Sequence, residues 1–317
     1  MDKIELIKRN SAEIINEEDI SKLLKKKKPI TYCGYETSGE IHLGHLVTIT
    51  KLLELQKAGF HVKILFADWH TYLNQKGDWD FINKQIKQWK AGFIAAGLKD
   101  AEFILGSSFQ RTLEYIDDVF TIATKTTINR SLRSMQQVGR DIEKAKVSQV
   151  IYPFMQIADI KHLKVDLVQS GIEQRKIHML GTEALKEINY KSPIFVHTPL
   201  ISSLKGPGSK MSSSEEGSFI SIRDSKESIE KKIKKAHCPA KEKQENPILE
   251  IIKLIIFPRM ENFEIKRPEK FGGNLTFENY DTLEKEFENG NIHPLDLKNS
   301  VSEYLEIIIS PIRKKFK

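Results

Sequence analysis

Short segments of strand character alternate with stretches of helical periodicity along the first part of the chain. The strand candidates are residues 30–34, 61–67, 102–106, 166–169 and 194–197. Strands that alternate with helices form βαβ units, in which parallel strands make a sheet with helices on both faces. The sequence therefore predicts an α/β protein whose first part is a Rossmann-like parallel-sheet domain. Ligands bind such sheets at the carboxyl ends of the strands.

Two departures from this alternation predict the domain organisation. A helical stretch at residues 113–139 interrupts it, which indicates a helical insertion over about 107–147 within a first domain of residues 1–204. After Asp224 the strand signals disappear, and helical patterns follow at residues 225–236, 247–256, 282–288 and 294–316. We expect an α-helical second domain over 225–317, joined to the first by a linker loop over 205–224.

Composition limits the kind of protein. The 317 residues are 39% hydrophobic and 29% charged, without an apolar run of about 18 residues or a secretory signal, so we expect a cytoplasmic protein with no membrane partner. Cys33 and Cys238 lack metal-ligand spacing and are expected to be reduced thiols. The net charge of +7 fits a polyanionic partner such as nucleic acid, although the basic runs at residues 25–28 and 313–315 are better explained as solvated helix ends than as specific contacts.

The segment His42-Leu43-Gly44-His45 follows the first predicted strand and opens the helical pattern of residues 43–60. A helix start offers free backbone N–H groups to anions, glycine lets a nucleotide approach the backbone, and two imidazoles can bind phosphate oxygens. Taken alone, the motif could also be a surface helix start that happens to carry two histidines.

A second motif, Lys210-Met211-Ser212-Ser213-Ser214, lies in a segment rich in glycine and serine at residues 205–217. Such a segment predicts a mobile loop, and a lysine with flanking hydroxyls suits a phosphate clamp. A solvated linker is the alternative for this segment alone.

Three polar residues, Tyr152, Gln156 and Asp159, recur at helical spacing in an otherwise apolar stretch, with Pro153 expected near the first turn of the helix. Buried polar groups need partners, so these residues either pair within the protein or face a ligand.

The two motifs in this order resemble the signature pair of the class I aminoacyl-tRNA synthetases. Longer matches resemble the tyrosyl-tRNA synthetases of the archaeal and eukaryotic branch and extend over nearly the whole chain. They include Tyr32, Gly34 and Glu36 before the first motif, and residues 67–75, 152–159, 171–178, 266–273 and 293–298.

The resemblance implies a pocket for L-tyrosine. Tyr32 and Asp159 would bond the phenol, and Tyr152, Gln156 and Gln174 would hold the ammonium group. A phenol donates one hydrogen bond and accepts another, so phenylalanine would leave the two phenol-binding groups unpaired. The full predicted tyrosine-binding set is Tyr32, Gly34, Glu36, Ala67, His70, Tyr152, Gln156, Asp159 and Gln174.

The implied reaction is attack of the tyrosine carboxylate on the α-phosphorus of ATP, giving tyrosyl-adenylate and pyrophosphate, followed by transfer of tyrosine to the 3′ end of tRNA(Tyr). His42, His45 and Lys210 would be catalytic, with Mg²⁺ arriving on ATP and no tightly bound protein-ligated metal. Glu215 and Glu216 depart from the usual basic continuation of the second motif, and we expect them to disfavour loop closure. The predicted ATP-binding residues are Gly44, Met211, Ser212 and Ser213.

By the same resemblance, Arg133 and Lys176 would contact the acceptor end of the tRNA, the insertion would form a homodimer, and the residues Phe271, His293 and Asp296 would read the anticodon. On sequence alone, Phe271 and His293 could be ordinary core and capping residues. The rival classes are a tryptophanyl-tRNA synthetase, a non-catalytic synthetase-like RNA-binding protein and a small-molecule nucleotidyltransferase.

Overall fold

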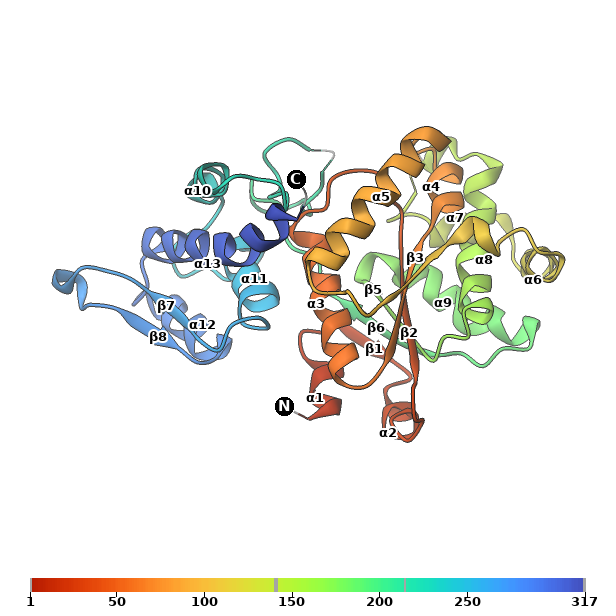
Figure 1. The fold of residues 1–317 in the computed structure, drawn as a ribbon, viewed down its shortest axis with the longest axis horizontal. Helices are drawn as coiled ribbons and strands as arrows, with labels where there is room; N and C mark the ends of the chain where they lie inside the picture. The colour runs from red at the N-terminus through yellow and green to blue at the C-terminus, as the bar shows by residue number, and fades with distance from the viewer. Residues whose placement is uncertain (1, 140–141, 214, 316–317) are drawn as a thin grey trace. The chain divides into compact units, whose positions relative to one another are not determined.

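A computed structural model describes residues 2–139, 142–213 and 215–315 (Figure 1). The chain divides into two compact units. The first comprises residues 1–38, 51–90 and 98–199, and the second comprises 39–50, 91–97 and 200–317. The division falls within helices α3 (Leu43–Lys57) and α5 (Trp79–Ala95), so each unit contains part of both. Ser214 of the second motif and Phe316 of the last predicted helix lie outside the described residues.

The first unit contains a six-stranded sheet in the order β1-β6-β5-β2-β3-β4. The predicted parallel strands are confirmed as β2 (Ile30–Tyr35), β3 (His61–Phe66), β4 (Glu102–Leu105), β5 (Leu167–Gly171) and β6 (Ile194–Thr198). The edge strand β1 (Glu13–Ile15) was not predicted, because three residues are too few to establish an alternating pattern. It runs antiparallel to β6 and pairs Glu13 with His197.

Helices of the first unit include α1 (Lys3–Lys8), α2 (Ile20–Leu23), α4 (Asp68–Leu73), α6 (Leu113–Thr124), α7 (Ile128–Ser134), α8 (Val147–His162) and α9 (Arg175–Ala184). Both helices of the predicted insertion, α6 and α7, pack against α8. The expectation that Pro153 lies near a helix start is wrong, because Pro153 lies inside α8. Proline inside a helix removes one backbone hydrogen bond. The helix nevertheless continues through Pro153, because the apolar side chains that follow, between Phe154 and Ile160, are buried in the core.

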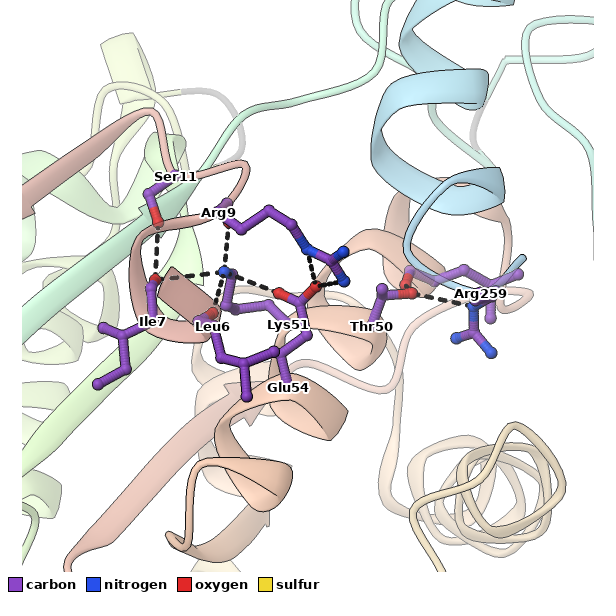
Figure 2. Close-up of polar contacts among 9 residues, drawn as sticks. Leu6, Ile7, Arg9, Ser11, Thr50, Lys51, Glu54 and Arg259 are labelled. Atoms are coloured by element: carbon purple, nitrogen blue, oxygen red, sulfur yellow. Dashed lines mark hydrogen bonds and ion pairs between the residues drawn. The ribbon is translucent and has the colours of Figure 1, made fainter. Parts of the chain in front are cut away.

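Buried charges attach α1 to the rest of the first unit (Figure 2). Lys51 is 2% exposed, and its Nζ donates to the carbonyl oxygens of Leu6 at 3.0 Å and Ile7 at 3.2 Å. The same ammonium lies 2.8 Å from a carboxylate oxygen of Glu54, which also pairs with Arg9. A lysine at the carbonyl end of a helix satisfies groups that the helix itself leaves open. The amino-terminal helix is thereby held by Lys51.

The second unit contains α10 (Lys226–Lys235), α11 (Pro247–Ile251), the π-helical turn Ile252–Ile256, α12 (Tyr280–Asn289) and α13 (Pro294–Lys314). These helices confirm the predicted helical stretches, and α10, α11 and β7 pack against α13 (Figure 1). The expectation that strands end at Asp224 is wrong, because β7 (Phe263–Ile265) and β8 (Leu275–Phe277) form an antiparallel pair. Within the described ranges, no helix is both long and apolar enough to span a membrane.

Candidate active site

One cavity in the first unit is lined by every residue of the predicted tyrosine-binding set. Strand β2 supplies two of them at its carboxyl end, α8 supplies three on one face, and the remainder follow β2, β3 and β5. The lining residues are Tyr32, Gly34, Glu36, Leu65, Ala67, His70, Tyr152, Gln156, Asp159, Gln169, Ser170 and Gln174. The fold thus brings residues from four separate segments, 32–36, 65–70, 152–159 and 169–174, to one edge of the sheet.

Asp159 lines this cavity and is 1% exposed. Its Oδ1 accepts hydrogen bonds from Gln110 Nε2 at 2.8 Å and from Tyr115 Oη at 2.9 Å. Burial raises the pKa of Asp159 to about 7, although these two donors oppose the shift. With Oδ1 occupied by two donors, Oδ2 is the oxygen left to accept from a ligand.

His70 lies beside Asp159, with 3.7 Å between His70 Nε2 and Asp159 Oδ2. Burial lowers the pKa of His70 to about 3, so the ring is neutral. Its Nδ1 lies 3.4 Å from the amide nitrogen of Gln110 and accepts from it, which puts the ring proton on Nε2. Within the described part of the chain this Nε2 is buried without a hydrogen-bond partner, as is Gln169 Oε1. Unpartnered buried polar atoms at a cavity indicate a site for a polar ligand.

Two amides, those of Gln156 and Gln174, also line the cavity. Gln156 Nε2 lies 3.3 Å from Gln174 Oε1, and the ring of Tyr152 stands edge-on to His70 with 4.6 Å between centroids. The carboxylate of Glu36 is already partnered, accepting from Asn74 and pairing with Lys76. These residues therefore offer carbonyl and hydroxyl groups to a cation, whereas the Glu36 carboxylate is engaged by the protein.

The predicted nucleotide motifs both belong to the second unit. His42 pairs with Ser221 in an antiparallel bridge, Leu43 N donates to Ile220 O, and Ile222 N donates to Ile41 O. The chain following the second motif is thus paired with the chain entering the first. Two segments distant in sequence are brought together as the resemblance implies.

Hydrogen bonds fix the proton on the first histidine of this motif. His42 Nδ1 accepts from Gly44 N at 3.1 Å, so the ring carries its proton on Nε2. Burial and nearby Lys210 lower the pKa of His42 to about 4, which keeps the ring neutral. His45 Nδ1 accepts from His42 N at 3.1 Å in the same way. Each ring therefore has an Nε2–H suited to donation to a phosphate oxygen.

The loop of the second motif is anchored at its base. Lys210 is exposed and pairs with Ser202 in an isolated bridge, while buried Met211 donates its backbone N–H to Ile201 O at 2.8 Å. Ser213 lies against Gly39, where a Cβ would come within 2.5 Å of the serine hydroxyl. The loop thus holds a solvent-facing lysine on a fixed base.

Glu215, one of the two unusual glutamates, forms a 2.8 Å ion pair with Lys205. Its charge is therefore compensated within the loop, whereas Glu216 is exposed. The expectation that both glutamates disfavour loop closure stays a prediction, and the ion pair weakens its physical basis for Glu215.

The predicted tRNA-contacting residues lie on the surface. In the first unit, Arg133 is exposed on α7 and Lys176 is half-buried on the adjacent α9. In the second unit, Phe271 is 60% exposed, which excludes a core role. His293 accepts from Leu295 N at 3.1 Å at the start of α13, so it does cap that helix, and Asp296 follows in the first turn.

Arg267 ties these second-unit residues together. Its Nε donates to Gly273 O at 2.6 Å and its Nη1 donates to Asn291 O at 3.0 Å. The loops that carry Phe271 and His293 are therefore held side by side.

Sequence reasoning missed Gln110 and Tyr115. Gln110 comes shortly after β4, so its position beyond the carboxyl end of a strand was a usable signal. Tyr115 lies in the insertion helix α6, and nothing local in the sequence connects it with Asp159. In the described residues, no group of three or more His, Cys, Asp or Glu side chains is arranged to hold a metal ion.

The parallel sheet, the cavity at its carboxyl edge and the paired histidine and lysine motifs define a nucleotide-using enzyme of the class I synthetase type. Comparison with known proteins agrees, because residues 24–310 match the family described as tRNA synthetases class I (W and Y). The chain belongs to this family, and within it to the tyrosine-tRNA ligases.

The relatives place the chain in the archaeal branch. It is 48% identical to the tyrosine-tRNA ligase of Methanococcoides burtonii, with 99% of each chain covered. The crystal structure of the Archaeoglobus fulgidus tyrosyl-tRNA synthetase complexed with L-tyrosine matches with a TM-score of 0.96 at 47% identity, again over 99% of each chain.

A tryptophanyl-tRNA synthetase from Aeropyrum pernix matches with a TM-score of 0.74 at 20% identity, covering 94% of this chain and 82% of that one. At this identity the match concerns the fold alone. The fold class, the enzyme class and the family predicted from the sequence are therefore confirmed.

Proposed function

We propose that this chain activates L-tyrosine with ATP and transfers it to the 3′ end of tRNA(Tyr), recognising the amino acid in the cavity around Asp159. The observation that carries the proposal is the buried carboxylate, whose Oδ1 is occupied by Gln110 and Tyr115 and whose Oδ2 is left for a phenol. Tyr32 lies in the same cavity and supplies a hydroxyl donor. A phenol can use both groups, whereas a phenyl ring would leave them unpaired.

In the first step the tyrosine carboxylate attacks the α-phosphorus of ATP and pyrophosphate leaves. The carboxylate is ionised at neutral pH and needs no general base, so catalysis depends on position and on charge. His42 and His45 donate from Nε2 to phosphate oxygens, and Lys210 neutralises the leaving pyrophosphate. Ser212, Ser213, Met211 and Gly44 complete the ATP site, and Mg²⁺ enters bound to ATP.

In the second step tyrosine is transferred to tRNA. Arg133 and Lys176 contact the acceptor end, and Phe271, His293 and Asp296 bind an anticodon base by stacking and hydrogen bonds. We assign residues 1–204 to catalysis, 205–224 to the mobile linker and 225–317 to anticodon binding. Because charged tRNA serves translation, we propose the cytoplasm as the site of action.

The insertion supports a homodimer. It carries a set of exposed apolar side chains, namely Leu113, Phe120, Ile128 and Val147, with exposed fractions of 82%, 61%, 66% and 76%. Apolar side chains exposed over one short segment are typical of an interface. Sedimentation of the purified chain tests this assignment, and a monomer at micromolar concentration would contradict it.

The decisive test of the proposed function is ATP/pyrophosphate exchange without tRNA, with tyrosine, tryptophan or phenylalanine as the activating amino acid. We expect exchange with tyrosine alone. Exchange with tryptophan alone would reassign the cavity and keep the mechanism. In the variant Asp159→Ala, discrimination against phenylalanine should collapse, and unchanged selectivity would remove Asp159 from recognition.

A further inference from the structure

A continuous chain of hydrogen bonds runs through the first unit from the edge of the sheet to the cavity. Glu13 Oε2 lies 3.1 Å from His197 Nδ1, and His197 Nε2 lies 2.9 Å from His178 Nδ1. His178 Nε2 lies 3.4 Å from Gln156 Nε2. Both rings are buried, with exposed fractions of 0% for His197 and 1% for His178. This series of hydrogen bonds connects the carboxylate of Glu13 on β1 with the amide of Gln156 in the cavity.

The groups around Glu13 determine which atoms donate and which accept in this series of hydrogen bonds. Arg175 donates to both oxygens of Glu13, at 2.9 and 2.7 Å, and holds the pKa of that carboxyl below its usual value. Glu13 is therefore ionised and can only accept. Burial lowers the pKa of both His197 and His178, so each ring is neutral, with one N–H and one lone pair.

The ionised Glu13 and the neutral rings determine which nitrogen of each histidine carries the proton. His197 donates from Nδ1 to Glu13, which leaves its Nε2 as an acceptor for His178 Nδ1–H. His178 then presents the lone pair of Nε2 to Gln156. The ring of Phe195 stacks on that of His178, with 4.8 Å between centroids and 28° between the ring planes.

The consequence falls on the amide of Gln156. A glutamine amide can be turned over so that its oxygen and nitrogen exchange places, and its hydrogen-bond partners decide the orientation. Here the amide nitrogen has two acceptors, His178 Nε2 and Gln174 Oε1 at 3.3 Å. Both N–H groups are thus used within the protein, and the carbonyl oxygen is left for a ligand in the cavity.

We propose that Glu13, His197 and His178 are positioning residues that orient the Gln156 amide so that its carbonyl oxygen accepts from the ammonium group of tyrosine. Turned over, the amide would present its N–H groups to a cation, which they cannot bind. This inference rests on the proposed role of Gln156 in holding the ammonium group. None of the three residues touches the substrate.

The test uses three ligands on the full-length protein. Tyrosine carries both ammonium and carboxylate, tyramine keeps the amine, and 3-(4-hydroxyphenyl)propionate lacks it. KM for tyrosine and ATP would be measured by pyrophosphate exchange, and the other two compounds would be measured as competitive inhibitors. The variants are His178→Phe, which removes the acceptor, and His178→Gln, whose amide oxygen can replace Nε2. His61→Phe, at a histidine paired with Glu102, is the matched control.

In His178→Phe we expect tyrosine and tyramine to bind about 3- to 10-fold more weakly, as for loss of one hydrogen bond of about 1 kcal/mol. The propionate and ATP should bind as before, and His178→Gln should restore tyrosine to within about twofold. Equal weakening of all three ligands would overturn the inference, because it would indicate a general loss of structure and no effect on the amine in particular. Unchanged binding of all three would overturn it too, because His178 would then not affect recognition of the amine.

Two further variants keep the inference testable if His178→Phe fails to fold. Glu13→Ala, at the partly exposed end, should weaken tyrosine and tyramine alone, and Glu13→Gln should not, since its amide oxygen still accepts from His197. Gln156→Ala separates the two proposals. If that variant binds tyramine normally, the assignment of Gln156 fails and the inference fails with it. If Gln156→Ala weakens tyramine but His178→Phe does not, only the inference fails.

Discussion

The carboxylate of Glu250 on α11 accepts two hydrogen bonds from Ser202, one from its backbone N–H at 2.6 Å and one from its hydroxyl at 3.0 Å. Ser202 in turn pairs with Lys210 across the base of the nucleotide loop. Glu250, a residue outside the signature motif, therefore holds the segment that pairs with Lys210.

Glu250→Ala should therefore raise the KM for ATP about 3- to 10-fold, because a two-bond anchor is lost beside the lysine. The KM for tyrosine should not change. Glu250→Gln keeps one acceptor oxygen, so its KM for ATP should lie between those of the parent protein and of Glu250→Ala. Pyrophosphate exchange with ATP and tyrosine varied separately makes the measurement, and a parallel rise in both constants would contradict the prediction.

Gly44 should not tolerate a side chain. A Cβ there would lie 2.8 Å from His42 Cε1 and 3.0 Å from His42 Nδ1, so Gly44→Ala must displace the ring that is aimed at the phosphates. We expect exchange kcat to fall at least about tenfold, since small misplacements of a catalytic group are costly. Gly181→Ala, where the nearest atom lies at 3.4 Å, is the control and should retain activity.

Asp159 should reduce stability at high pH. Its pKa in the fold is about 7 against a usual 3.8. The contribution of the protonated carboxyl to the free energy of unfolding is therefore fully present below about pH 4 and is lost as the pH rises through 7. Asp159→Asn should raise the free energy of unfolding at pH 8 by a few kcal/mol, at about 1.4 kcal/mol per pKa unit, and leave it nearly unchanged at pH 4.5.

Urea unfolding at the two pH values checks this prediction. Asp118→Asn is a suitable comparison, because Asp118 pairs with Lys161 and His162 and its loss should destabilise the protein at pH 8. Equal stability of Asp159→Asn and the parent protein at pH 8 would argue against a strained carboxylate.

Removing the ammonium of Lys51 should loosen the amino terminus. Lys51→Ala removes the Lys51 donor from the carbonyl oxygens of Leu6 and Ile7, of which Ile7 keeps a hydrogen bond from Ser11, and leaves Glu54 buried with Arg9 as its remaining partner. Breaking a buried pair costs about 3 kcal/mol or more, so unfolding should occur at lower urea concentration and amide exchange should accelerate in α1. Lys57→Ala, at an exposed position of the same helix, should have almost no effect.

Much of the fold was predictable because the parallel strands and the long helices carry strong periodic signals. Three-residue strands such as β1 and β7 lack such a signal, and tertiary pairing alone forms them. The cavity residues could be named from their motifs, whereas Tyr115 and His197 could not. Their partners lie far away along the chain: 44 residues separate Tyr115 from Asp159, and 184 residues separate His197 from Glu13. No local pattern encodes such pairs.

The pairing of β1 with β6 has a consequence for synthesis on the ribosome. Glu13 emerges early, but its partner His197 is made 184 residues later, after every other strand of the sheet. Long-range pairings of this kind form late and slowly. The nascent chain can assemble β2, β3 and β4 before β6 is made, so during that time β1 lacks the strand with which it pairs. The hydrogen bonds from Glu13 to Gln156 can therefore form only after all six strands of the sheet have been translated.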